Sequence, residues 1–205
     1  MTDRTEQPGP DSRGRYHHGD LQRALIAAAE AILAERGLEG FTLREAARQA
    51  GVSAAAPAHH FGSAAGLLTA VAVQGFDLLA RYLREGTAEG GDDPAARLRG
   101  QGMGYVRFAQ AHPALFQLMF RRGAVQRDDE KLHQAGQGTF GLLEDAVRAY
   151  RGIAPGLPLD QAATITVMAA WSTVHGFAHL ALEGKFERME GGDALLPDLL
   201  MALWP

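Results

Sequence analysis

The stretch from Thr42 to Phe61, TLREAARQAGVSAAAPAHHF, is the part of the chain that most constrains its fold. Thr42 and Glu45 have the spacing of a capping box, in which the hydroxyl accepts from the Glu45 amide and the carboxylate reaches back to the cap. A helix is therefore expected to begin here. Gly51 has the conformational freedom that ends such a helix, and Ser53 is a favourable N-cap for another. The stretch predicts two short helices joined by a tight turn.

Two short helices across a glycine turn are typical of a helix-turn-helix. In that motif the second helix enters the DNA major groove, about 12 Å wide, where its first residues reach base-specific donors and acceptors. Two core helices of an ordinary bundle would give the same pattern, so the pattern alone leaves both interpretations open. The residues expected on the DNA side are Arg15, Thr42, Arg44, Ser53, Ala54, Ala55, Ala56, His59 and His60.

The surrounding residues resemble the N-terminal domain of TetR-family transcriptional regulators from Tyr16 to Phe76, with matches that include Arg36-Gly37, Phe41-Thr42, Ala50-Gly51-Val52-Ser53 and His60-Phe61. Further along, the runs His112-Pro113-Ala114-Leu115-Phe116 and Trp171-Ser172-Thr173-Val174-His175-Gly176 resemble the ligand-binding domain called WHG in one TetR subgroup. The resemblance implies a homodimeric regulator, most often a repressor, that binds a palindromic DNA operator and responds to a small-molecule effector.

Three positions depart from the family pattern. Ala58 stands where the family usually has Tyr, Ala64-Ala65 where it usually has Lys-Glu, and Pro57 where it usually has Leu. The usual Tyr and Lys contact phosphates, and each missing phosphate interaction flattens the salt dependence of binding by about 0.9 in log-log slope. A dimer with weakened DNA binding, which acts by binding a ligand or a partner, is therefore kept as an alternative.

Composition limits the kind of DNA-binding surface that the chain can have. The 205 residues are 46% hydrophobic, enough for a sizeable core, and the formal net charge is −4. Residues 1–85 carry nine Arg, no Lys and ten acidic residues, so any DNA-binding surface has to be a local patch of Arg. The chain has no Cys, which excludes disulfides, thiolate metal sites and a thiol nucleophile.

The first fifteen residues are polar and rich in Pro and Gly, and they lack the apolar core of a secretory signal. They are expected to form a flexible arm. The uncharged segment Gln161 to Leu182 is long enough to span a bilayer, but it contains His175 and His179, which are costly in lipid. A cytoplasmic protein without a membrane segment is expected.

Capping, periodicity and breaker residues predict an all-α chain of about nine helices. An N-terminal three-helix domain with the helix-turn-helix is expected at 16–62, followed by a connecting helix at 63–85 and a helical ligand-binding and dimerisation domain at 86–205. Asp20 is expected to cap the first helix, Gly86 to Asp93 to form a loop, and Pro113 to start a short helix after a break. The glycine-containing helix near residues 130–150 is expected to be irregular, and a last helix is expected from Asp193 to Trp204.

The C-terminal half contains bulky apolar and aromatic residues that would suit an internal pocket. The same residues would also suit a filled core, and the resemblance favours the pocket. The residues expected to bind a ligand are Met103, Phe108, Phe116, Met119, Phe120, Phe140, Trp171 and His175. The segment 159–183 is apolar on more than one face, so one face is expected to pair with a second subunit, together with the last helix.

Neither catalysis nor a cofactor is expected. The chain has no GxSxG, P-loop or dinucleotide fingerprint, and no nucleophile with an obvious base. His175 and His179 have a spacing that metal sites use, with Glu183 four residues on, but Gly176 stands where a HExxH protease carries its Glu. A metal-dependent enzyme using these three residues remains the second alternative, and no metal site is expected.

Overall fold

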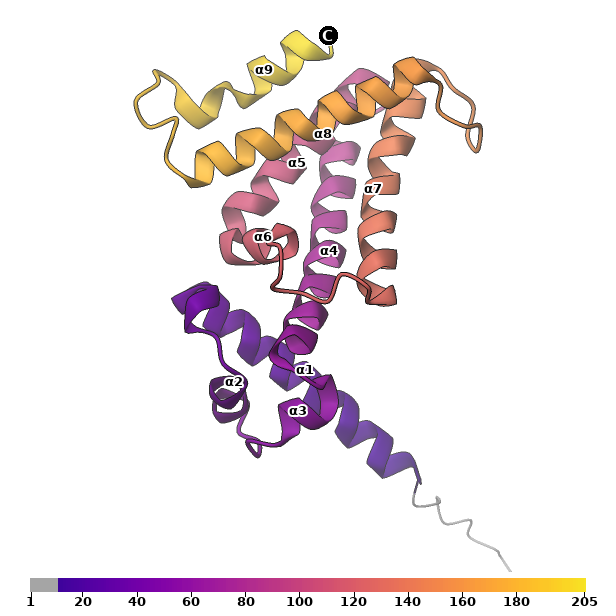
Figure 1. Ribbon diagram of the computed structural model, residues 1–205. Helices are drawn as coiled ribbons and strands as arrows, with labels where there is room; N and C mark the ends of the chain where they lie inside the picture. The colour runs from indigo at the N-terminus through magenta and orange to yellow at the C-terminus, as the bar shows by residue number, and fades with distance from the viewer. Residues whose placement is uncertain (1–10) are drawn as a thin grey trace, which may run out of the picture. The chain divides into compact units, whose positions relative to one another are not determined.

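The structure is a computed structural model that describes residues 11–205, with side chains from Asp20 onward apart from residue 193. Within that range the chain forms nine α-helices and two short 3-10 helices and contains no strand (Figure 1). The all-α prediction is confirmed. The expected flexible arm lies largely outside the described residues.

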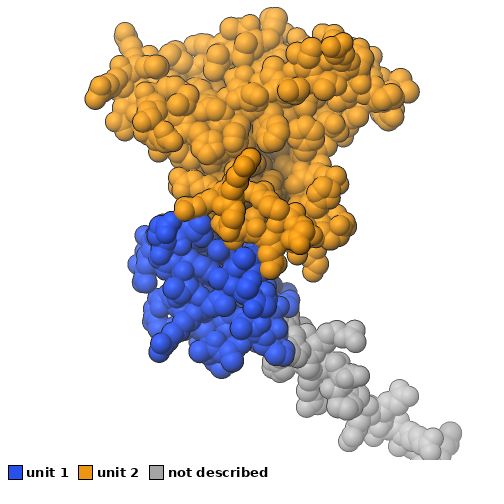
Figure 2. Space-filling model, in the orientation of Figure 1, with its two compact units in different colours: residues 1–71 blue, residues 72–205 orange. Residues whose placement is uncertain are grey.

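The chain divides into two compact units, residues 1–71 and 72–205, which are coloured separately in Figure 2. The division falls inside helix α4, Ala64–Glu89. The segment that was expected to be a separate connecting helix therefore contributes its first turns to one unit and the remainder to the other.

Unit 1 is a small helical bundle around one apolar core. Leu25, Ala29 and Ile32 of the first helix are fully buried, as their helical spacing predicts. Ala46 and Ala47 pack from the second helix. The elements before α4 are α1 (Asp11–Arg36), the 3-10 helix η1 (Leu38–Gly40), α2 (Leu43–Gln49) and α3 (Ala56–Phe61).

Two helix starts in unit 1 differ from the sequence prediction. α1 begins at Asp11, so Asp20 lies inside it and does not cap it. α3 begins at Ala56, and Ser53 does not cap it by a side-chain hydrogen bond. Pro57 explains the second difference, because proline is accommodated in the first turn of a helix but clashes with the residue four positions earlier when it lies further in.

Unit 2 consists of the rest of α4 and five further helices, several of which begin at an aspartate cap. The Asp93 carboxylate accepts from the amides of Ala95 and Ala96, 3.1 and 3.0 Å away, and Asp129 and Asp160 cap two later helices in the same way. Pro113 separates two helices as predicted. The elements are α5 (Pro94–Ala111), α6 (Pro113–Phe120), α7 (Glu130–Arg151), α8 (Gln161–Leu182), η2 (Gly192–Leu195) and α9 (Leu196–Leu203).

Glycines bring α4 and α5 into direct backbone contact. A Cβ on Gly100 would lie 2.1 Å from the carbonyl oxygen of Gly86, and one on Gly104 would lie 2.2 Å from that of Tyr82. The sequence predicted a loop from Gly86 onward. This prediction is wrong for residues 86–89, which form the end of α4. Gly86 was interpreted as a helix breaker, but it is a packing residue that allows two helices to touch.

Two further elements of unit 2 differ from the sequence prediction. α7 is one uninterrupted helix, although Gly136, Gly138 and Gly141 each lower helix propensity by about 1 kcal/mol relative to Ala. Its contacts with α5 and α8 compensate. The last segment starts as the 3-10 turn η2, and its α-helix begins at Leu196.

Two of the described helices, α4 and α8, are long and apolar enough to cross a membrane if only length and composition are considered. Core helices of soluble proteins meet the same criteria. α8 packs against α5 and α7 in unit 2 and runs across the ends of these helices in Figure 1. The two helices therefore provide only weak evidence for a membrane location.

We predict that Gly104→Ala lowers the free energy of unfolding of unit 2 by about 1–3 kcal/mol, because the new methyl group overlaps the Tyr82 carbonyl oxygen and forces the helices apart. Gly138→Ala is the matched control, since nothing lies within 4 Å of its added Cβ. It should stabilise the protein by about 0.5–1 kcal/mol. Urea unfolding followed by circular dichroism measures both. Equal effects of the two substitutions would contradict the proposed helix contact.

Candidate DNA-binding surface and ligand cavity

The first helix of the predicted motif is capped as expected, but only by one half of the capping box. The Glu45 amide donates to the Thr42 hydroxyl oxygen at 3.1 Å. The Glu45 carboxylate does not reach back, because Arg48 takes both of its oxygens, at 2.9 Å from Nε and 2.6 Å from Nη2, and Arg36 lies 3.2 Å away. α2 ends at Gln49 with Ala50 as its C-cap, and Gly51 follows with a φ of 69°, as predicted.

Arg48 and Arg36 keep the Glu45 carboxylate ionised. Hydrogen bonding and charge from Arg48, with a smaller contribution from Arg36, lower the pKa of Glu45 from 4.5 to about 2. The guanidinium of Arg36 belongs to α1, whereas Glu45 and Arg48 belong to α2. The ion-pair network therefore ties α1 to α2, and it occupies two of the arginines in the region expected to face DNA.

The turn and α3 present small residues to solvent. Ser53, Ala54 and Ala55 are exposed and precede the helix, and Ala56 is half-buried at its first position. His59 is exposed and His60 half-buried, with their rings 5.1 Å apart in an edge-on arrangement. Ala58 is exposed as well, so no large side chain stands where the family pattern has Tyr.

Thr42 and Arg44 are also exposed. Among the described residues Arg44 has no hydrogen-bond or ion-pair partner, in contrast to Arg36 and Arg48. Thr42, Arg44 and the positions from Ser53 to His60 thus lie within one helix-turn-helix. The side chain of Arg15, which was expected to contribute from the arm, lies outside the described residues.

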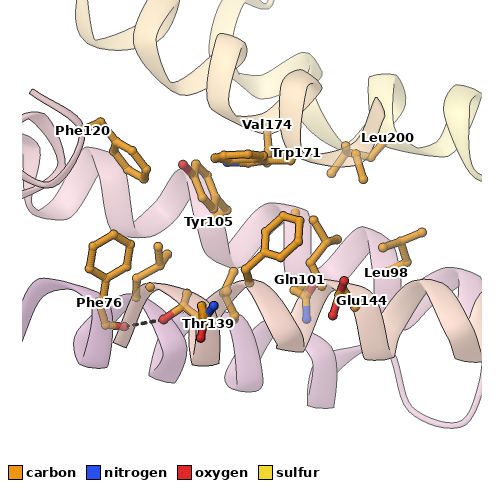
Figure 3. A pocket seen from close by; sticks show the side chains of 18 of the residues that line it. Phe76, Leu98, Gln101, Tyr105, Phe120, Thr139, Glu144, Trp171, Val174 and Leu200 are labelled. Atoms are coloured by element: carbon orange, nitrogen blue, oxygen red, sulfur yellow. Dashed lines mark hydrogen bonds between the residues drawn. The ribbon is translucent and has the colours of Figure 1, made fainter. Parts of the chain in front are cut away.

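Unit 2 contains a cavity of about 660 Å³, within the range typical of small-molecule sites. Its walls come from six helices, α4 to α9, and the α5 residues Leu98, Gln101, Gly102 and Tyr105 follow one helical face. In Figure 3, Phe76 and Phe120 lie toward one end, and Leu98, Leu200 and Glu144 toward the other. Other lining residues are Leu79, Leu83, Thr139, Phe140, Leu143, Ala170, Trp171, Val174 and Trp204.

Three of the eight residues expected to bind a ligand line this cavity, namely Phe120, Phe140 and Trp171. Phe108, Phe116 and Met119 do not, because they are fully buried in the packing of unit 2. Met103 and His175 are partly buried but lie outside the lining. For these five residues the predicted place in the cavity wall is wrong, and the aromatic residues with fully enclosed rings stabilise the core.

Sequence reasoning missed the polar lining. Gln101 is only 4% exposed, and its amide nitrogen donates to the Leu142 carbonyl at 3.1 Å and to the Thr87 hydroxyl at 3.3 Å. Thr139 donates to the Phe76 carbonyl at 3.2 Å and to that of Ala135 at 2.8 Å. Polar residues inside an apolar helix face were the available signal, since such residues need a buried partner or a polar ligand.

An aromatic cluster borders the cavity at Tyr105. Its hydroxyl shares a 2.7 Å hydrogen bond with His175 Nδ1, and the rings of Phe120 and His179 lie 4.7 and 4.6 Å from that of His175. Burial raises the pKa of Tyr105, and burial with the charge of His179 lowers the pKa of His175. Both groups are therefore neutral near pH 7, and their hydrogen bond fixes the orientation of both rings.

Two of the three residues of the alternative metal site interact with other side chains. His175 uses Nδ1 for Tyr105, and the Glu183 carboxylate lies 3.7 Å from the Lys185 ammonium. Among the residues whose side chains the structure describes, no three His, Cys, Asp or Glu residues are grouped as a metal ion would require.

The chain matches two family models. Residues 25–71 match bacterial regulatory proteins of the tetR family, and residues 98–203 match the Tetracyclin repressor-like C-terminal domain. A search of the curated proteins found no match. The chain therefore belongs to the TetR family of transcriptional regulators, and its helix-turn-helix is the DNA-binding motif of that family.

Solved structures share the fold over nearly the whole chain. A protein of unknown function from Rhodococcus sp. RHA1 is 33% identical, with 97% of each chain covered and a TM-score of 0.78. A putative TetR-family transcriptional regulator from Rhodococcus sp. is 22% identical, covering 91% of this chain and 100% of that one, with a TM-score of 0.64. The TetR-family regulator PfmR from Thermus thermophilus is 19% identical, covering 89% and 94%, with a TM-score of 0.61.

We predict that Glu45→Gln destabilises the protein at pH 7, because it removes the ion pairs that join α1 to α2. The pKa of Glu45 is lowered on folding, so its contribution is fully present above pH 4.5 and is lost as the pH falls toward about 2. The urea midpoints of variant and wild type should therefore differ at pH 7 and converge in acid.

The matched control is Asp77→Asn, which removes an exposed carboxylate that has no described partner. Its midpoint should follow that of the wild type across the same pH range. A Glu45→Gln midpoint equal to that of the wild type at pH 7 would show that the arginine network adds nothing to stability.

Proposed function

We propose that this protein is a homodimeric transcriptional repressor that a small, mainly apolar ligand releases from DNA. The ligand-free dimer holds its two α3 helices in successive major grooves, roughly 34–36 Å apart, on a palindromic operator. It acts in the cytoplasm, without a catalytic step and without a cofactor. The proposal rests above all on one observation, namely that a chain with a DNA-binding motif also encloses a ligand-sized cavity.

Helix α4 supports a route from ligand to DNA. Phe76, Leu79 and Leu83 on this helix line the cavity. The same helix begins in unit 1, at the Ser63 cap whose hydroxyl oxygen accepts from the Gly66 amide at 3.1 Å. A ligand that displaces α4 in unit 2 would change the orientation of its first turns, and with them the spacing of the two α3 helices. The ligand then acts through its different affinity for the two arrangements.

Exposed residues of the motif support the DNA side of the proposal. Arg44 has a guanidinium without a partner among the described residues, so it is available to a phosphate or a guanine edge. Ala54 and Ala55 are exposed ahead of α3 and would contact thymine methyl groups. His59 is exposed in α3 and would reach a phosphate or base edge.

Exposed apolar residues on α8 and α9 support a dimer. Ile165 and Met168 are 58% and 62% exposed, and Leu199 and Leu203 on α9 are 38% and 46% exposed. Large apolar side chains gathered on two neighbouring surface helices are typical of a subunit interface. A second copy of the same surface would cover them in a two-fold arrangement.

A second candidate is a TetR-family dimer that binds DNA weakly and acts on a ligand or partner. Ala58 and Ala64 favour it, because both positions are exposed and neither side chain can reach a phosphate. A gel shift with the promoter of its own gene at low and moderate salt separates the two candidates. The repressor retains operator binding at moderate salt, and the second candidate does not.

We predict that Arg44→Ala weakens operator binding by about tenfold to a hundredfold while the dimer stays intact, since a charge-assisted hydrogen bond contributes about 1.5–3 kcal/mol. If Arg44 binds a phosphate, the slope of log K against log salt should also flatten by about 0.9 for each phosphate interaction that the substitution removes. Fluorescence anisotropy with labelled operator at several salt concentrations measures both quantities.

Arg151→Ala is the control for this prediction, because Arg151 is an exposed arginine at the end of α7 in unit 2. It makes the same change in net charge and should leave the affinity within about twofold. Unchanged affinity of Arg44→Ala would instead mean that α2 does not face DNA.

We also predict that the double substitution Ile165→Glu and Met168→Glu makes the protein monomeric at micromolar concentration. Burying each unpaired carboxylate in an apolar interface costs at least about 2 kcal/mol, and each appears twice in a dimer. Sedimentation equilibrium measures the change. Leu157→Glu is the control, because Leu157 is 54% exposed but precedes α8, and it should leave the dimer unchanged. A variant that remains dimeric would exclude the α8 surface.

A further inference from the structure

We propose that the ligand of this cavity is an amphiphilic cation, with an amine or quaternary ammonium group on an apolar or aromatic body. The inference rests on the proposed ligand-binding function of the cavity and adds the charge of the ligand and the residue that recognises it. Glu144 on α7 is that residue, and Gln101 and the neighbouring aromatic rings assist it.

Glu144 places the only carboxylate of the described lining in a mostly apolar wall, without a counter-ion. It is half-buried, it lines the cavity, and among the described residues it has no hydrogen-bond or ion-pair partner. Arg148, four residues further along α7, does not neutralise it. That guanidinium instead pairs with Asp145 at 2.9 Å and donates to the Leu157 carbonyl at 3.1 Å. Removing a carboxylate from water without a partner is costly, and a bound cation would compensate that cost.

Gln101 adds a second acceptor at the same end of the cavity. Its amide nitrogen donates to the Leu142 carbonyl, which can only accept, so the orientation of the amide is fixed. The Gln101 side-chain oxygen is then the atom left for a ligand, and none of the described residues donates to it. Leu142 precedes Glu144 by two residues on α7, and Gln101 and Glu144 lie close to each other in the view of Figure 3.

Aromatic rings form part of the cavity wall. Trp171 and Phe140 lie with their centroids 5.6 Å apart, and Trp204 and Tyr105 also line the wall. The faces of such rings attract cations, most strongly those of Trp. Phe76, Leu79 and Phe120 offer only hydrocarbon for the rest of the ligand. The cavity therefore offers a ligand two acceptors, aromatic faces and a hydrocarbon surface.

The only basic residue in the described lining is poorly placed to select an anion. Arg127 is exposed, and its Nη2 donates to the Arg121 carbonyl at 3.1 Å. It precedes α7, whereas Glu144 lies roughly 20 Å along that helix from its start, at about 1.5 Å per residue. Water screens the charge of Arg127, while the half-buried Glu144 is screened less. A cationic ligand is favoured for this reason.

The test compares three probes with the same alkyl chain, namely decyltrimethylammonium, decanol and decanoate, below their micelle or solubility limits. The chain has two Trp residues, and both line the cavity, so tryptophan fluorescence of the full-length protein reports binding directly. The cation should bind about tenfold or more tightly than decanol, as expected for a carboxylate together with cation–π contacts. Decanoate should bind more weakly than decanol.

Glu144→Gln should reduce the preference for the cation over decanol to about threefold or less, while decanol affinity and circular dichroism stay unchanged. Glu85→Gln, an exposed position on α4 outside the cavity, makes the same charge change and should keep the preference.

Tightest binding of decanoate, or an undiminished preference in Glu144→Gln, overturns the proposal. If decanol binds and the cation is not preferred, only this inference fails. If none of the probes binds, the ligand-binding function itself fails, and no DNA is needed to distinguish the two outcomes.

Discussion

The backbone contact between α4 and α5 is the constraint on which the rest of unit 2 depends. Gly86, Gly100 and Gly104 let the two helices approach until carbonyl oxygens occupy the space of a side chain. α5 in turn packs against α6, α7, α8 and α9. This contact covers the face of α5 that carries Gly100 and Gly104. A different face of the helix, with Gln101 and Tyr105, therefore lines the cavity. The cavity thus follows from how closely two helices are allowed to pack.

Features that depend on a few neighbouring residues could be predicted from the sequence. The Thr42 cap, the Gly51 turn and the helix starts at Asp93 and Pro113 all occur as expected, because the chain satisfies its own backbone groups there. Gly86 shows the limit of such reasoning. A glycine favours a loop in isolation, and only contact with Gly100, on a different helix, makes it a helical residue.

The same limit applies to the site. Residues of the helix-turn-helix could be assigned because the motif is a continuous stretch, and exposed positions such as Arg44 and Ser53 lie where the pattern predicts. The cavity is built from residues on six helices, spread from Phe76 to Trp204. Size and aromaticity correctly suggested that Phe120 and Trp171 line the cavity. They suggested the same for Phe116, which is instead fully buried in the core. That distinction depends on how each helix is rotated against its neighbours.

Trp204 gives the cavity wall a property that its other residues do not share. It follows α9, a helix of eight residues that is too short to persist in water by itself. α9 is held by packing against α5, and the Trp204 carbonyl accepts from Arg99. Fluctuations that detach α9 would remove one side of the enclosure while the longer helices stay folded. The residence time of a bound ligand would then be limited by the fraying of α9.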